Sequence, residues 1–69
     1  MARPDTFTYP ENSTSRAMHA ASKTRKCEDG SFEAVAAFWF NGVRQNMKYA
    51  VGATRAKATA AAMKAIGCD

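Results

Sequence analysis

The chain of 69 residues has no leucine, one isoleucine and few of the residues that build catalytic or metal sites. Histidine occurs once, as His19, and the two cysteines, Cys27 and Cys68, lie far apart without a CxxC spacing. The four glycines are isolated, which excludes a glycine-rich phosphate loop. A lone histidine lacks the partner that acid-base catalysis or metal binding needs. We therefore expect no enzyme, no cofactor and no metal site.

Long apolar runs are also missing. No stretch approaches the roughly 20 apolar residues of a membrane span. The polar N-terminus lacks the apolar core of a secretory signal. Two unclustered cysteines are typical of free thiols in a reducing compartment. These features predict a cytoplasmic protein that does not contact a membrane.

Alanine dominates what is present: hydrophobic residues make up 46% of the chain, and fifteen of them are alanine. So few large apolar side chains predict one small domain of modest stability. Binding to a partner, or to a second copy in a homodimer, would stabilise it further. Residues 1–12 contain both prolines and indicate an extended N-terminal segment, followed by a single domain over residues 13–69. The alternating residues 6–9 indicate either a short edge strand or a mobile tail.

Residues 13–24 have the spacing of a short helix, capped by Ser13 or Ser15, with alanines recurring along one side. Gly30 would follow it as a turn residue. Residues 31–40 and 43–51 then flank Asn41-Gly42, which is the strongest short signal for a β-hairpin.

A two-residue turn fixes the register of this hairpin. It opposes Phe40 with Val43, Trp39 with Arg44 and Val35 with Lys48. The core face would then carry one polar residue, Gln45, among Phe32, Ala34, Ala36, Phe38, Phe40, Val43, Met47, Tyr49 and Val51.

A last helix is predicted over residues 55–66, with Thr54 as its N-cap and Gly67 as its stop. It would return toward the hairpin turn, which separates Cys68 from Cys27 and disfavours an intrachain disulfide. The predicted fold is α+β: an antiparallel β-hairpin, or a three-stranded sheet, packed against one or two helices.

The formal net charge of +4 favours a polyanion or an acidic protein surface as partner. On the polar hairpin face Trp39 opposes Arg44, with Lys48 further along, the composition of a base-stacking platform. Alternatively, the N-terminal segment covers Trp39 through Phe7 and Tyr9.

Further cations lie at the predicted helix. Arg55 and Lys57 begin it, where backbone N–H groups also favour anions. A secondary basic patch would consist of Lys23, Arg25, Lys26 and Lys64. The alternative for each is an ordinary solvated charge.

The stretch from Lys48 to Ala62 resembles the strand-to-helix end of double-stranded RNA-binding domains. Thr54 and Arg55 match the family's Ser-Lys helix start in type, and Ala58 and Ala62 match its alanines. Ala56 and Thr59 stand where the family has phosphate-binding lysines, its Gly-Pro-x-His loop is absent, and two strands rather than three are evident between the helices. The hairpin and helix also resemble AP2-like and integrase arm-type DNA-binding domains. By size alone the chain resembles phage-encoded inhibitors of the anti-CRISPR type.

Two functions follow as hypotheses. The first is a non-enzymatic module that binds DNA or RNA, with Arg44, Lys48, Arg55 and Lys57 on phosphates and Trp39 stacking. The second is a phage-type inhibitor that binds a host protein complex and blocks its nucleic-acid site, with Trp39 and Arg44 as interface anchors.

Overall fold

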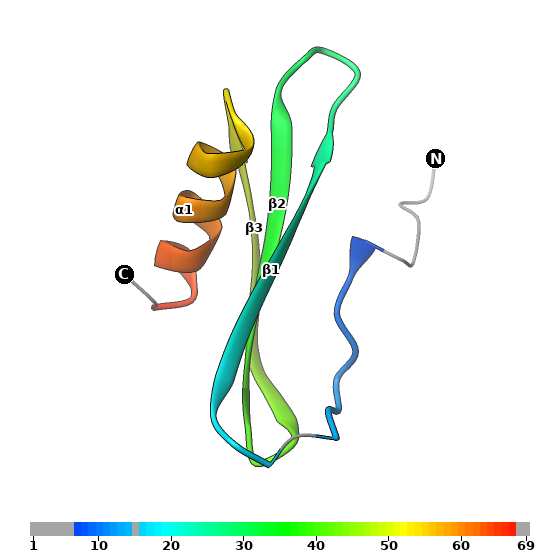
Figure 1. Cartoon of the computed structure of the whole chain (residues 1–69), viewed down its shortest axis with the longest axis vertical. Coiled ribbons are helices and arrows are strands. Elements are labelled where there is room, and N and C mark those ends of the chain that lie inside the picture. Colours follow the sequence, from blue (N-terminus) through cyan, green and yellow to red (C-terminus); the bar gives the residue numbers. More distant parts are fainter. Residues whose placement is uncertain (1–6, 15, 68–69) are drawn as a thin grey trace.

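Three antiparallel strands followed by one helix make up the fold, which is α+β as predicted (Figure 1). The computed structural model describes residues 7–14 and 16–67. The sheet has the order β1-β2-β3, and the helix packs on one of its faces. The elements are β1 (His19–Lys26), β2 (Phe32–Phe40), β3 (Val43–Gly52) and α1 (Arg55–Ala65).

The helix predicted over residues 13–24 is wrong, because most of this segment belongs to β1. All eight residues of β1 pair with β2, from His19 opposite Trp39 to Lys26 opposite Phe32. The pairing gives the β1 backbone cross-strand hydrogen bonds, and β1 itself has no large apolar side chain that would hold a helix on the core. A turn containing Asp29-Gly30 joins the strands, with Gly30 at φ 91°.

The Asn41-Gly42 turn is confirmed, with φ of 57° and 84° at its two residues. The predicted pairs Phe40 with Val43 and Trp39 with Arg44 are also confirmed. Beyond them a register irregularity places Phe38 opposite Asn46, so the predicted register is off by one from that point.

This shift moves every later residue of β3 to the other face of the sheet. Lys48 lies opposite Ala36 instead of Val35, and Tyr49 takes the place opposite Val35. The assignment of Met47, Tyr49 and Val51 to the core face beneath the helix is therefore wrong.

Alanine contacts hold α1 on the sheet. Ala58 and Ala62 of the helix pack against Ala34 and Ala36 of β2, and all four are fully buried. Such small side chains let the helix axis approach the sheet closely. A Cβ atom on Gly52 would lie 2.6 Å from the backbone nitrogen of Ala58, so only glycine fits there.

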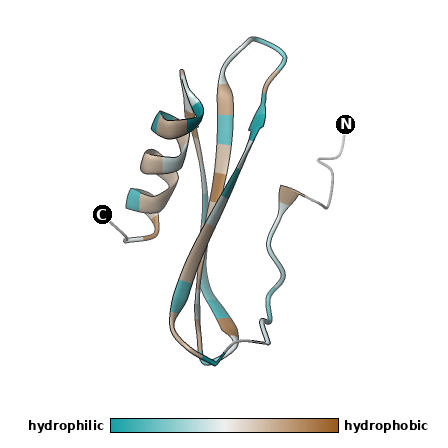
Figure 2. Ribbon diagram, viewed as in Figure 1, coloured by the Kyte–Doolittle hydropathy of each residue, from teal (hydrophilic) through white to brown (hydrophobic). Residues whose placement is uncertain are grey.

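The helix boundaries agree with the prediction to within one residue. Thr54 caps α1, because its side-chain oxygen accepts a hydrogen bond from the Lys57 amide at 3.1 Å. The helix covers only part of the sheet, however. Phe40 and Val43, predicted as core, are 56% and 52% exposed beside the hairpin turn. Along β2 the colours are mostly hydrophobic or intermediate (Figure 2), and Glu33 is the one charged residue of this strand.

An extended segment, residues 7–13, crosses the sheet face opposite α1, and we call it the strap (Figure 1). Its far end joins the edge of β3: the Ser13 amide donates to Gly42 O at 2.8 Å and the Arg44 amide to Glu11 O at 2.7 Å. Residues 7–9 form no strand, and Thr6 lies outside the described residues. The third strand of the sheet is β1 instead.

Candidate functional site

The structure divides the predicted binding residues between the two faces of the sheet. Trp39 and Arg44 lie beneath the strap together with Lys23 and Arg25. The remaining cations lie on the helix side or on α1 itself: Lys26, Lys48, Arg55, Lys57 and Lys64. Lys48 was predicted beside Trp39, and the shifted register of β3 separates the two.

Trp39 is buried, with 3% of its surface exposed. The Tyr9 ring meets it edge-on at a centroid distance of 5.2 Å, and the His19 ring stacks in parallel at 4.8 Å. The indole Nε1–H donates to Pro10 O at 3.2 Å. The expectation of an exposed platform is therefore wrong, and the alternative that the N-terminal segment covers Trp39 is confirmed.

The Arg44 side chain contacts the strap. Its Nη1 donates to Tyr9 O and also lies 3.5 Å from the Met47 sulfur. Its Nη2 is 4.0 Å from the Glu11 carboxylate, which is 84% exposed. An exposed pair at this distance contributes little stability, so the carbonyl contact dominates.

Two further cations flank the aromatic rings of the strap. Arg25 lies over the ring of Phe7 at 4.7 Å and pairs with Glu33 at 2.9 Å. Lys23 lies over the ring of Tyr9 at 4.6 Å and donates to Thr8 O at 2.9 Å. These distances suit cation-π attraction, so both cations support the strap.

Partial burial of Tyr9, a residue of the strap, against the sheet also changes its pKa. The pKa of Tyr9 is raised above its ordinary value, because desolvation disfavours the phenolate. Outside the strap, hydrogen bonds from Ser31 lower the pKa of Asp29 in the turn between β1 and β2.

The helix side is exposed and basic. Arg55 lies over the Phe32 ring at 4.8 Å and donates to Thr24 Oγ1 at 2.8 Å, which fixes its guanidinium above the sheet. Lys26 follows Thr24 on the same face of β1. Lys57 and Lys64 are seven positions apart on α1, so they share a side of the helix.

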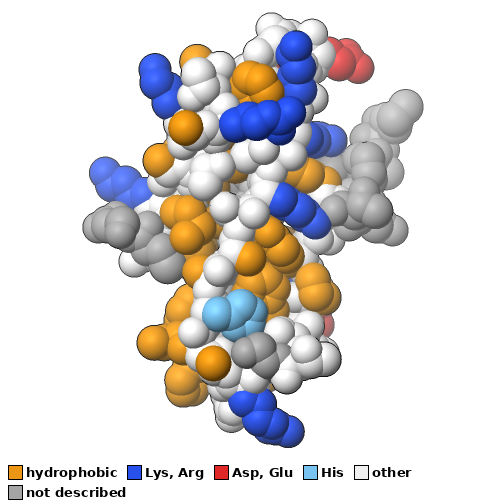
Figure 3. All heavy atoms as spheres, in the orientation of Figure 1, with side chains coloured by type: hydrophobic (Ala, Val, Ile, Leu, Met, Phe, Trp, Pro, Cys, Tyr) orange, Lys and Arg blue, Asp and Glu red, His pale blue; other side chains and the backbone are white. Residues whose placement is uncertain are grey.

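We call Lys26, Lys48, Arg55, Lys57 and Lys64 the basic surface. Within residues 7–14 and 16–67 none of these side chains pairs with a carboxylate. In the orientation of Figure 3 most of the visible blue side chains lie over the upper half of the molecule, where α1 begins. Carboxylates of the described residues therefore do not neutralise the basic surface.

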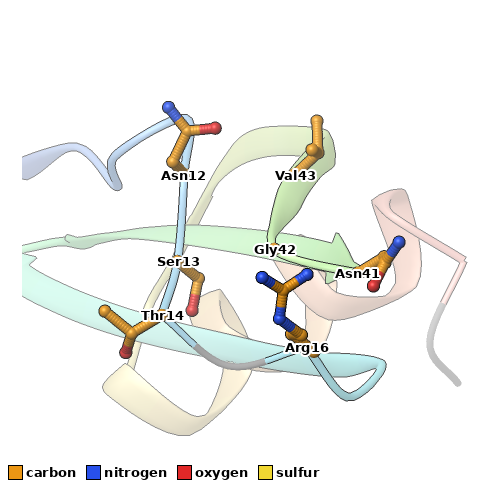
Figure 4. Close-up of a pocket in the computed structure, with 7 residues that line it drawn as sticks. All are labelled: Asn12, Ser13, Thr14, Arg16, Asn41, Gly42 and Val43. Carbon is orange, nitrogen blue, oxygen red and sulfur yellow. The ribbon is translucent and has the colours of Figure 1, made fainter.

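The opposite end of the molecule holds an open pocket of about 410 Å³ (Figure 4). It lies where the strap meets the hairpin turn, and Figure 4 shows the Arg16 guanidinium between the Ser13 and Asn41 side chains. The remaining lining residues are Asn12, Thr14, Gly42 and Val43. Among the described residues its lining is mostly polar, and Arg16 is the charged side chain there.

No sequence pattern indicated a site at Arg16. The pocket beside Arg16 forms between the end of the strap and the hairpin turn, which are far apart in the sequence. The sequence indicated Phe7 and Tyr9 as part of a short edge strand or mobile tail and as a cover for Trp39. No spacing indicated how closely the sheet would contact the strap. In the described part of the chain no group of three His, Cys, Asp or Glu side chains is placed to hold a metal ion.

Comparison with models of protein families, with curated proteins and with solved structures finds no match to this chain. No helix among the described residues is long and apolar enough to cross a membrane.

Proposed function

We propose that the protein is a non-enzymatic nucleic-acid-binding module whose basic surface contacts the phosphate backbone. The observation that carries this proposal is the group of five cations on the helix side, none of which pairs with a carboxylate of the described residues. Such charges attract a polyanion and release its counterions on binding. The proposed setting is the cytoplasm, with the cysteines as free thiols.

The spacing of the helix cations supports a contact with several phosphates. Lys57 and Lys64 are separated by seven residues of α1, or about 10 Å along its axis. That distance corresponds to about three steps of 3.4 Å along one strand of a duplex. Arg55 is positioned by Thr24 and Phe32, which lowers the entropy lost when it binds.

The number of strands is a second support. Three strands precede the last helix, as in double-stranded RNA-binding domains, although the helix that precedes the strands in that family is not among the elements of the described residues. Reading a groove with the sheet, as AP2-like domains do, would require removal of the strap. We therefore propose contact through the helix side and through phosphates, which gives little sequence preference.

The test is a titration of the whole protein with duplex DNA and duplex RNA of about 20 base pairs at 50 and 200 mM salt. We expect affinity to fall steeply with salt. Replacing both Lys57 and Lys64 by glutamine should reduce the slope of log K against log salt by about 1.8 for DNA, about 0.9 per lost contact.

Arg16→Gln is the matched control, because Arg16 is an exposed cation at the opposite end of the molecule. It should leave the slope unchanged. A slope that is unaltered in the double variant, or binding that is insensitive to salt, would contradict phosphate contact through the basic surface.

A second candidate is the inhibitor that binds a host protein complex. It is favoured by the apolar side chains exposed near the hairpin turn, where Met18, Phe40 and Val43 are 65%, 56% and 52% exposed. Nucleic-acid phosphates would not use this patch, whereas a protein partner or a second copy would. Loss of protein binding in Phe40→Ser, with nucleic-acid affinity absent throughout, would favour the inhibitor.

A further inference from the structure

The strap is held mainly through its backbone. Four consecutive strap carbonyls each accept a hydrogen bond from a sheet side chain, and the four donors come from all three strands. The pairs are Tyr49 Oη to Phe7 O at 3.4 Å, Lys23 Nζ to Thr8 O at 2.9 Å, Arg44 Nη1 to Tyr9 O, and Trp39 Nε1 to Pro10 O at 3.2 Å. Contacts of this kind recognise an extended chain whatever its side chains are.

The side-chain contacts select for aromatic residues at two positions. The rings of Phe7 and Tyr9, two residues apart, each lie against one cation and one aromatic ring of the sheet. Phe7 is 6% exposed, so its position is an enclosed subsite. Pro10 follows Tyr9 and supplies the carbonyl for the indole.

We propose that this sheet face is a binding site for an extended segment of another protein with the pattern aromatic, any residue, aromatic, proline. The strap is its occupant within the same chain. The charge of the face favours a segment with acidic neighbours, because Lys23, Arg25 and Arg44 line it and Glu33 is the acidic residue among them. In the strap itself Glu11 follows Pro10 and approaches Arg44.

The strap competes with such a partner for the same sheet face. It is joined to β1 by residues 14–18, so it competes at an effective concentration on the order of millimolar. A segment added in trans therefore binds with an affinity reduced by the fraction of molecules whose strap is open. Weakening the strap should raise that fraction and strengthen binding in trans.

The experiment adds the capped hexapeptide Phe-Thr-Tyr-Pro-Glu-Asn, the sequence of residues 7–12, to the full chain and to its Tyr9→Ala variant. Binding is followed by the fluorescence of Trp39 and by the NMR signal of its indole N–H. We expect the variant to bind the peptide at least about tenfold more tightly than the wild type, because its own strap no longer fills the second aromatic position. The Arg16→Gln variant, changed at an exposed residue outside the strap, should bind like the wild type.

A peptide with alanine in place of its tyrosine should bind the Tyr9→Ala variant at least about tenfold more weakly, since it leaves the position beside Trp39 empty. If Tyr9→Ala does not fold alone, the unaltered peptide should restore its folded spectrum. The proposal is overturned if the folded variant shows no saturable change, if both peptides bind it equally, or if the peptide fails to rescue an unfolded variant. These outcomes are independent of nucleic-acid binding, which uses the other face.

Discussion

Replacing Trp39 by alanine should remove most of the stability of the domain. The indole is 3% exposed and contacts the rings of Tyr9 and His19 and the carbonyl of Pro10. Truncation of a buried tryptophan costs about 3–5 kcal/mol. At about 0.05–0.15 kcal/mol per residue, a chain of 69 residues has a total of about 3–10 kcal/mol to lose. In a domain of this size, 1 kcal/mol shifts the melting temperature by about 4–8 °C.

Trp39→Phe is the milder comparison. It keeps an aromatic ring beside Tyr9, but loses the bond from Nε1 to Pro10 O and part of the buried ring volume. The lost bond is worth about 1 kcal/mol and the lost volume adds to it, so the melting temperature should fall by at least about 4–8 °C, but by less than in Trp39→Ala. Thermal melts followed by circular dichroism measure both. A Trp39→Ala protein that melts within a few degrees of the wild type would refute the strap as a structural cover.

Three further changes test other parts of the fold. Gly52→Ala should destabilise the domain by about 1–3 kcal/mol in urea denaturation, because the new Cβ would lie 2.6 Å from the Ala58 backbone; unchanged stability would mean that α1 sits farther away. Thr54→Ala should cost about 1 kcal/mol in the same assay through loss of the cap on Lys57 N, and a variant as stable as the wild type would contradict the cap. Above about pH 10 the unfolded chain ionises Tyr9 before the folded chain does, so stability should fall as the pH rises. Tyr9→Phe should reduce that fall in melts between pH 9 and 11, and an identical fall in both proteins would exclude burial of the phenol.

The second half of the chain was predictable because its signals are local. Asn41-Gly42 requires two residues with positive φ, and Thr54 with Gly67 delimits α1. The first half was not, because the residues of β1 are small or polar and have no strong preference of their own. Its strand conformation comes from pairing with β2, and the Asp29-Gly30 signal for that hairpin was interpreted as the end of a helix.

The positions of the candidate binding residues depend on the register between β2 and β3, and no local sequence pattern indicates the shift in that register. The register shift near Phe38 places Lys48 on the helix side and Tyr49 beneath the strap, the reverse of an unbroken register. An extended segment that crosses a sheet face also has no periodicity of its own. Phe7 and Tyr9 are recognisable as candidates only because aromatic residues are rare in an otherwise polar N-terminus.

The strand order leaves the two sheet edges unequally protected against aggregation. The turn end of β3 is bridged by the strap through Asn12 and Val43, whereas β1 is the last strand on its side. A free edge can template pairing with another molecule, and cations along it oppose such pairing. Lys23, Arg25 and Lys26 place three positive charges within four residues of β1. Two β1 strands meeting edge to edge would bring these charges together, which opposes growth of the three-stranded sheet through this edge.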